Sequence, residues 1–296
     1  MDPLRLISIF SSAFILLFIL ITAFSLLFAS GESISKLGLG FLTSAEWDPN
    51  TGRFGALPAI AGTAITTVIS VFIASIVGIG TAVYISGGYS PYWVRRLITP
   101  LIDSLAAVPS VVIGLWGLLF LSPLLENAYS LVSSHLGFIP FFGGPARGVS
   151  LMTASIILSI MIIPTIASLS SSAIEMVPNE LKEGARALGA TKWETLRIVT
   201  LPYASSYIAS SILLATARAM GETMAVTMVI GNSHDLPKSL FQPGCTITSV
   251  IASEFLEATS SLYLSSLMEL GLILLAISLL VNITAVLMRR GFHARA

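Results

Sequence analysis

Six stretches of apolar residues, each long enough to cross a lipid bilayer as a helix, constrain this chain more than any other feature. The hydrocarbon layer is about 30 Å thick and takes roughly 20 apolar residues in helical form. Because the apolar residues form blocks and do not alternate with polar ones, the pattern favours helices over a membrane β-barrel. We therefore predict an all-α integral membrane protein with six transmembrane helices, at residues 6–29, 57–86, 98–121, 149–173, 204–230 and 264–288.

The charge and cysteine content narrow the classes of protein further. Of the 296 residues, 55% are apolar and 10% are charged, against roughly 25% charged in ordinary soluble domains. The formal net charge is zero, which gives no reason to expect a nucleic-acid partner. The single cysteine, Cys245, excludes an intrachain disulfide and a zinc site built from thiolates. The histidines lack metal-ligand spacing, so we expect no metal site at His135, His234 or His293.

The first apolar block has two interpretations. Arg5 precedes it and the small residues 29–31 follow it, which resembles a signal peptide with its cleavage site. The apolar run is longer than the roughly 7–15 residues of a signal-peptide core, so we read it as a retained helix. The chain then divides into a peripheral N-terminal transmembrane helix with an outer loop (residues 1–55), a core of five transmembrane helices (56–290) and a cytoplasmic tail (291–296).

Basic residues are distributed unequally between the two sides of the predicted bundle. With a cytoplasmic N-terminus, ten of them fall in cytoplasmic segments and four on the opposite side. Because short cytoplasmic loops carry an excess of Lys and Arg, this count favours both termini in the cytoplasm. The ten are Arg5, Arg95, Arg96, Lys182, Arg186, Lys192, Arg197, Arg289, Arg290 and Arg295; the four are Lys36, Arg53, Arg147 and Lys238.

The cytoplasmic loop of residues 174–203 contains a helix with a marked end. Pro178 suits the first turn of a helix. Gly189 is placed to end that helix in the left-handed conformation. Three apolar residues fall on one face of it at helical spacing: Leu181, Ala185 and Leu188.

A second helix is predicted directly after this glycine. Thr191 and Glu194 have the spacing of a capping box, which starts a helix that we expect to run to Leu201-Pro202. The two short helices would meet at a sharp corner around Gly189. Such a corner is either an ordinary solvated loop or a rigid element that transmits force from a soluble partner to the membrane helices.

The residues of this loop resemble a known family signature. In binding-protein-dependent ABC importer permeases the "EAA" loop reads E-A-A, three residues, G, nine residues, I-x-L-P. Here the matching residues are Glu183, Gly184, Ala185, Gly189, Val199, Leu201 and Pro202, in which Gly184 replaces an alanine and Val199 the isoleucine. The resemblance implies a type I ABC importer (MetI-like) fold whose helix 179–189 docks on a separate ATPase. The implied coupling residues are Leu181, Glu183, Gly184, Ala185, Leu188, Gly189, Leu201 and Pro202.

Two further segments narrow the resemblance. Residues 103–117 look like the third span of phosphate permeases, and residues 217–232 look like their fifth span, in the form typical of C-type subunits. The similarity extends from about residue 55 to the C-terminus. It implies a multi-pass protein of the plasma (inner) membrane that passes inorganic phosphate inward by alternating access. The implied partners are an A-type permease subunit, two ABC ATPase subunits and an extracytoplasmic phosphate-binding protein, besides membrane lipid.

Two charged residues lie in the middle of the fifth apolar block. A charge at that depth costs roughly 2.5–3.5 kcal/mol on insertion scales, and Arg218 and Glu222, four residues apart, can pair along one helix face. They are either a structural ion pair or part of an anion pathway, in which the Arg218 guanidinium binds phosphate oxygens and Glu222 limits the affinity. We include Pro109 and Ser110 in this pathway, because Pro109 kinks the third span. Glu269, near a span end, is read as interfacial.

We expect no enzyme. Gly184 and Gly189 have the glycine spacing of a P-loop, but Ala190-Thr191 follow where Lys-Ser/Thr is needed to hold phosphates and magnesium. The chain itself therefore binds no cofactor, and ATP and magnesium belong to the partner ATPase. Two alternatives remain open: a permease of the same fold for molybdate, sulfate or phosphonate, and an ion-coupled carrier or membrane receptor that needs no ATPase.

Overall fold

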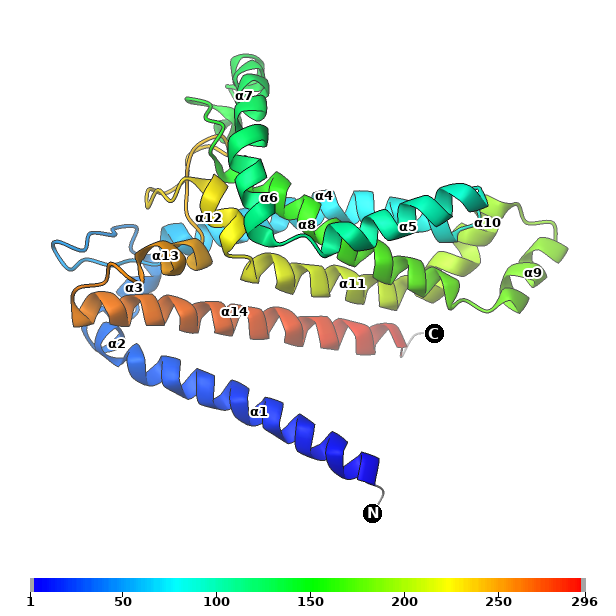
Figure 1. Cartoon of the computed structure of the whole chain (residues 1–296), viewed down its shortest axis with the longest axis horizontal. Coiled ribbons are helices and arrows are strands. Elements are labelled where there is room, and N and C mark those ends of the chain that lie inside the picture. Colours follow the sequence, from blue (N-terminus) through cyan, green and yellow to red (C-terminus); the bar gives the residue numbers. More distant parts are fainter. Residues whose placement is uncertain (1–2, 294–296) are drawn as a thin grey trace.

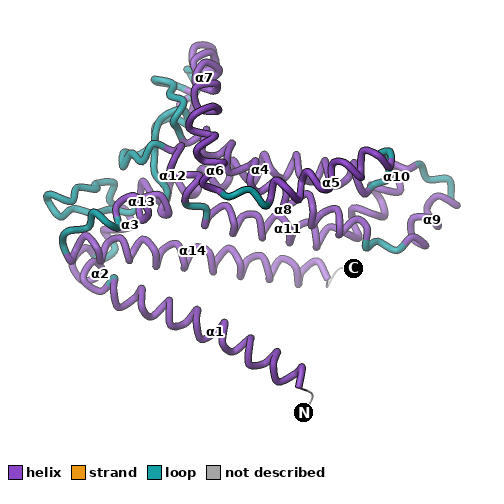
Figure 2. Tube along the Cα trace, viewed as in Figure 1, coloured by secondary structure: helices purple, strands orange, loops and turns teal. Residues whose placement is uncertain are grey.

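A computed structural model describes residues 3–293, with the side chains of residues 4–284. The chain is helical through most of this length (Figures 1 and 2). Short loops and two isolated β-bridges join the helices. The elements are α1 (Pro3–Ala29), α2 (Gly31–Leu37), α3 (Gly40–Thr43), α4 (Leu57–Ser86), α5 (Tyr92–Ala106), α6 (Ser110–Trp116), η1 (Gly117–Leu121, π-helical), α7 (Ser122–Leu136), η2 (Pro140–Phe142), α8 (Leu151–Glu175), α9 (Asn179–Ala187), α10 (Lys192–Thr195), η3 (Leu196–Thr200, π-helical), α11 (Leu201–Gly221), α12 (Met224–Ile230), α13 (Ile247–Glu254) and α14 (Ser261–His293).

Six helical segments among the described residues are long and apolar enough to cross a membrane, as predicted. The long helices α11 and α14 lie side by side and run in opposite directions, with α1 splayed from the bundle (Figure 1). We call the end that holds α9 the corner end and the end that holds α2, α3 and α13 the loop end. Helix α1 begins, and α14 finishes, toward the corner end (Figure 1). The predicted tail, 291–296, overlaps α14 as far as His293, and residues 294–296 lie outside the described part.

The centre of the bundle is the packing of α4 against α8. A Cβ added to Gly78 would lie 2.9 Å from Ile166, so the glycine lets the two backbones approach closely. The apolar core around this contact draws Ile157, Ile162 and Val226 from helices α8 and α12, all with at most 1% exposure. A second cluster joins α4 to α13 and α14 and includes Ile247 and Leu267, and polar groups buried among these clusters must find partners.

The third apolar block is not one helix, contrary to the prediction for residues 98–121. Helix α5 ends at Ala106, and Pro109 stands in an extended conformation immediately before α6. Proline lacks a backbone donor and disfavours helical geometry in the residue before it, so the helix breaks there. The segment that is long and apolar enough to span is instead Ser110–Leu136, and its last part, α7, projects away from the bundle (Figure 1).

The fifth block is also interrupted, contrary to the single helix predicted for residues 204–230. Helix α11 ends at Gly221, Glu222 is extended with ψ of 125°, and α12 begins at Met224. A buried backbone break needs replacement hydrogen bonds. Here the carbonyl of Glu222 accepts a hydrogen bond from the Thr248 hydroxyl at 2.9 Å. The first turn of α13 (Ile247–Glu254) therefore holds the break in place.

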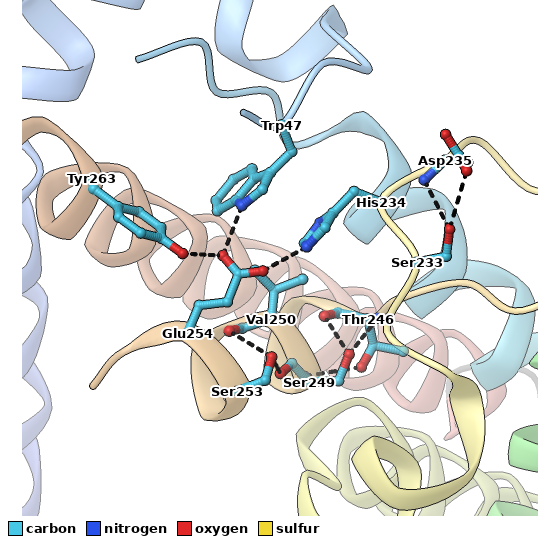
Figure 3. A network of polar contacts seen from close by, with 10 residues as sticks. All are labelled: Trp47, Ser233, His234, Asp235, Thr246, Ser249, Val250, Ser253, Glu254 and Tyr263. Atoms are coloured by element: carbon cyan, nitrogen blue, oxygen red, sulfur yellow. Dashed lines mark hydrogen bonds and ion pairs between the residues drawn. The ribbon is translucent and has the colours of Figure 1, made fainter. Parts of the chain in front are cut away.

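A polar network closes the loop end (Figure 3). The Glu254 carboxylate accepts hydrogen bonds from Trp47 Nε1 at 2.7 Å and from the Tyr263 hydroxyl at 2.6 Å. His234 Nε2 lies 2.5 Å from the other carboxylate oxygen, and its ring stacks on Trp47. Burial opposes ionisation of Glu254, but the hydrogen bonds, that of His234 first, outweigh it and hold its pKa below the ordinary value. Four separate segments of the chain thus meet at one carboxylate.

Candidate functional site: the coupling corner and the membrane-depth polar residues

The end of α9 has the predicted left-handed glycine. Gly189 has φ of +91° and donates to the carbonyl of Arg186 at 2.9 Å, while Ala190 donates to that of Ala185 at 3.1 Å. This pair of bonds is the Schellman arrangement, which satisfies carbonyls that a helix end would otherwise leave free. The chain therefore turns sharply at Gly189, as the sequence predicts.

The next turn has the predicted capping box. The Thr191 hydroxyl accepts from the backbone of Glu194 at 3.2 Å, and the Glu194 carboxylate accepts from the backbone of Thr191 at 2.8 Å. Two donors at the helix start are thus satisfied reciprocally. We call residues 179–195, from the start of α9 to the end of α10, the coupling corner.

The helix after the corner does not end at Leu201-Pro202, contrary to the prediction. Helix α10 passes through the π-helical η3 directly into α11, where Pro202 occupies the first turn. Pro202 lacks the backbone donor that a continuous helix would use at this point, and it directly follows the π-helical η3. Residues Lys192–Gly221 consequently form one candidate span, so a displacement of the corner passes into the membrane without a loop between them.

Among the described residues, none buries the apolar face of α9. No residue of α9 is buried, and the exposed fractions are 45% for Leu181 and 91% for Leu188. Leucines this exposed on a charged loop are typical of a protein interaction surface. The remaining predicted coupling residues of α9, Glu183, Gly184 and Ala185, lie on the same short helix.

Arg218 does not pair with Glu222. Arg218 Nη1 instead donates to the Thr165 hydroxyl of α8 at 3.2 Å, and no ion pair between Arg218 and Glu222 occurs among the described side chains. The predicted pair requires a continuous helix through both residues, and that helix ends at Gly221. Arg218 is exposed and Glu222 half-buried in the isolated chain.

Pro109 and Ser110 lie at the same level of the bundle as Glu222. Helices α6 and α12 run in the same direction, because a Cβ on Gly114 would meet Ala225 at 2.8 Å and one on Gly117 would meet Val229 at 3.3 Å. The starts of these two helices therefore lie at the same end of the pair. The break before α6 thus lies directly before one candidate span, and the break at Glu222 lies directly after another, with the exposed Arg218 one turn before Gly221.

Sequence reasoning missed two partners of these residues and one buried acid. Thr165 and Thr248 have no local pattern that links them to the residues they contact, because the contacts join separate helices. Glu269, read as interfacial, is 7% exposed and packs in α14. The sequence shows that Glu269 lies near the end of a span, but it does not show that neighbouring segments cover this side chain.

The residues of the corner and spans match a family model. The model described as "Binding-protein-dependent transport system inner membrane component" matches residues 74–296. The chain belongs to this family. As such a component it is a multi-pass inner-membrane transport subunit and not an enzyme, and membership implies a binding protein and an ATPase as partners.

Relatives extend this family's match over nearly the whole chain. The phosphate transport system permease protein PstC of Mesorhizobium japonicum is 44% identical over 278 residues, which cover 92% of this chain and 85% of the relative. That of Haemophilus influenzae is 44% identical over 281 residues, covering 93% and 89%. A probable phosphate transport system permease protein PstC of Methanocaldococcus jannaschii is 37% identical over 281 residues, covering 92% and 87%.

A solved structure shares the fold. A chain of the MetNI methionine ABC transporter in an inward-facing conformation aligns with a TM-score of 0.58 at 15% identity, covering 78% of this chain and 93% of that chain. The MetI-like permease fold predicted from the sequence is confirmed.

Proposed function

We propose that this chain is the C-type permease subunit of an ATP-driven importer of inorganic phosphate. The observation that supports this most is the similarity to phosphate permeases, at 44% identity over more than nine-tenths of the chain. The matched length, 92–93% of the chain, includes both the coupling corner and Arg218. The chain would form a heterodimer with an A-type permease and receive phosphate from an extracytoplasmic phosphate-binding protein.

We assign binding of the transported anion to Arg218. Its guanidinium presents paired donors that match the oxygens of a phosphate, and its bond to a neutral threonine leaves its charge uncompensated by that partner. Glu222, in the adjacent break, limits the residence of the anion by repulsion. Pro109 and Ser110 line the opposite side of the same zone, where the break before α6 widens the path.

The coupling corner is the part that we assign to the ATPase partners. Leu181 and Leu188 insert into a groove of the partner, and Glu183, Gly184, Ala185 and Gly189 shape the helix that carries them. Closure of the two ATPase subunits around ATP and magnesium would move this helix. Because α10 continues into α11 through Leu201 and Pro202, the movement reaches Arg218 along a single helical path.

The same assignment orients the chain in the membrane. The corner end is cytoplasmic and the loop end faces outward, with both chain termini inside. Helix α1 begins and α14 finishes toward the corner end, which supports this orientation (Figure 1). The excess of Lys and Arg at this end agrees with the positive-inside rule. Residues 1–55 then form the peripheral span with its outer loop, and residues 56–290 the transport core.

Uptake with competing anions tests the proposal. Cells that carry the complete importer as their sole phosphate uptake system are given radiolabelled phosphate with an excess of unlabelled sulfate, molybdate or methylphosphonate. We expect unlabelled phosphate alone to compete. If another oxyanion competed as well as unlabelled phosphate does, the permease would be assigned to that anion. Uptake that survives ATP depletion would favour an ion-coupled carrier.

A further inference from the structure

The polar face of α9 lines a cavity of the chain itself. Leu181 and Leu188 are exposed to solvent. Four other residues of α9, at helical spacing, border a cavity of about 210 Å³. The turn between α4 and α5 and the segment from α10 to η3 supply the other walls. The lining residues of α9 are Asn179, Lys182, Glu183 and Arg186.

The cavity carries an excess of positive charge. Lys182 and Arg186 of α9 and Lys192 of α10 line it, against the single carboxylate of Glu183. Among the residues that the structure describes, none of these three cations takes part in an ion pair. Lys182 donates to the neutral carbonyl of Ile174 at 3.3 Å. Cations gathered without counter-charges repel one another, and an anion between them removes that cost.

One wall of the cavity consists of residues that are almost fully buried. Thr195, Leu196 and Thr200 line it and are at most 4% exposed. Both threonine hydroxyls donate to backbone carbonyls within their own helical segment. A charge that rests against such a wall is screened less by solvent than one on an open surface. The cations at the rim therefore act on a bound anion more strongly than isolated surface residues do.

We propose that this cavity binds a phosphate group, either as free inorganic phosphate or as a phospholipid headgroup. Arg186 offers paired donors to its oxygens, and the two lysines add positive charge at other angles. Anionic headgroups gather at juxtamembrane basic clusters in the same way. The bound group bridges α9, α10 and the α4–α5 turn, so its presence stiffens the coupling corner against the spans. This site is separate from Arg218 and does not depend on which anion is transported.

Fluorescence of Trp193 reports on the cavity, because Trp193 follows Lys192 on α10 and is 57% exposed. The full chain in nanodiscs of neutral phosphatidylcholine is titrated with inorganic phosphate. In a second arm, without added phosphate, the nanodiscs contain a rising fraction of phosphatidylglycerol. The signal is the part of the fluorescence change that Trp193→Phe removes. We expect a saturable change in one arm at least.

Substitutions of basic residues distinguish binding in this cavity from binding elsewhere on the chain. Arg186→Gln should raise the half-saturating concentration about tenfold or more, the effect of losing one charge-assisted contact. The triple variant Lys182→Gln, Arg186→Gln, Lys192→Gln should remove the change. The matched variant Lys36→Gln, Arg53→Gln, Lys238→Gln, which loses three cations from the loop end, should keep it. Arg218→Gln should also keep it.

The two arms identify the source of the phosphate group. A response to inorganic phosphate in neutral nanodiscs assigns a free-phosphate site, and a response only to phosphatidylglycerol assigns a headgroup site. No response in either arm overturns the proposal. So does a response that Arg186→Gln and the triple variant leave unchanged, provided that both unfold at the wild-type temperature.

Discussion

Arg218 of α11 donates a hydrogen bond to Thr165 of α8 across 3.2 Å, so this arginine is held by a neighbouring helix and not by Glu222, which follows the end of α11. Thr165 directly follows Pro164, which interrupts the hydrogen bonds of α8. Glu222 lies beyond the end of α11, with its carbonyl bound to Thr248. The arginine and the acid can consequently move with different elements.

Thr165→Val should reduce phosphate uptake without abolishing it. The valine is nearly isosteric but cannot accept the Arg218 bond, which is worth about 1.5–3 kcal/mol when a charged group is involved. Loss of orientation should lower kcat/KM about tenfold in a radiolabelled uptake assay. Thr81→Val, which removes a bond only to the carbonyl of Val77 in the same helix, is the control and should stay near wild type.

Gly189→Ala and Gly184→Ala should have opposite effects on the corner. Neither added Cβ meets a neighbouring atom, so only the backbone conformation separates them. Gly189 has φ of +91°, where an alanine costs roughly 1–2 kcal/mol. Gly184 is helical, and alanine there stabilises the helix by about 0.5–1 kcal/mol.

The measurement for this pair is disulfide crosslinking of a cysteine at position 188 to the partner ATPase, together with phosphate uptake. We expect Gly189→Ala to lower both and Gly184→Ala to preserve both. Equal loss in the two variants would mean that glycine flexibility, and not the left-handed turn, is what the corner requires.

Gly62→Ala should disrupt the contact between α4 and the loop before α13. The added Cβ would overlap the carbonyl oxygen of Cys245, and overpacking of this kind costs typically 1–3 kcal/mol. Gly80→Ala on the same helix meets no atom within 4 Å and should be neutral or slightly stabilising. Thermal unfolding in detergent distinguishes them, and equal midpoints would contradict the close packing at Gly62.

Glu254→Gln should destabilise the loop end in a pH-dependent way. Hydrogen bonds from His234, Tyr263 and Trp47 hold the pKa of Glu254 below its ordinary 4.5, against the opposing effect of burial. A depressed folded pKa means that ionised Glu254 stabilises the fold above about pH 4.5, and that this stabilisation is lost as the pH falls through the folded value.

The variant should therefore unfold at a lower temperature than wild type at pH 7, and the difference should shrink toward pH 4. Glu46→Gln is the control, because Glu46 pairs with Arg53 at an exposed position. A constant difference between pH 7 and pH 4 would show that the charge of Glu254 plays no part in holding the loops.

Features that depend on nearby residues were predictable from the sequence. The number of spans follows from the runs of apolar residues, although the bounds of the third and fifth do not, and the turn at Gly189 follows from the position of one glycine after a helical pattern. The capping box of Thr191 and Glu194 is likewise a relation within three residues. In each case the energy that decides the structure comes from the backbone or from residues one turn away.

Features that depend on contacts between residues far apart in the sequence were not predictable from it. The break at Glu222 lies inside an uninterrupted apolar block, and its carbonyl is satisfied by Thr248, 26 residues away. Trp47 and Glu254, separated by 207 positions, form a hydrogen bond that no periodicity indicates. The periodic sequence pattern predicts a continuous helix, but hydrogen bonds from residues elsewhere in the chain stabilise a break in it.

Phosphate uptake and ATP hydrolysis, measured together in proteoliposomes that hold the complete importer with its binding protein, test the central claim most directly. Arg218→Gln should keep at least half of the wild-type ATP hydrolysis, because the coupling corner is intact, while uptake falls at least about tenfold, the loss expected from one charged contact. Undiminished uptake by Arg218→Gln would show that the anion does not pass beside this arginine.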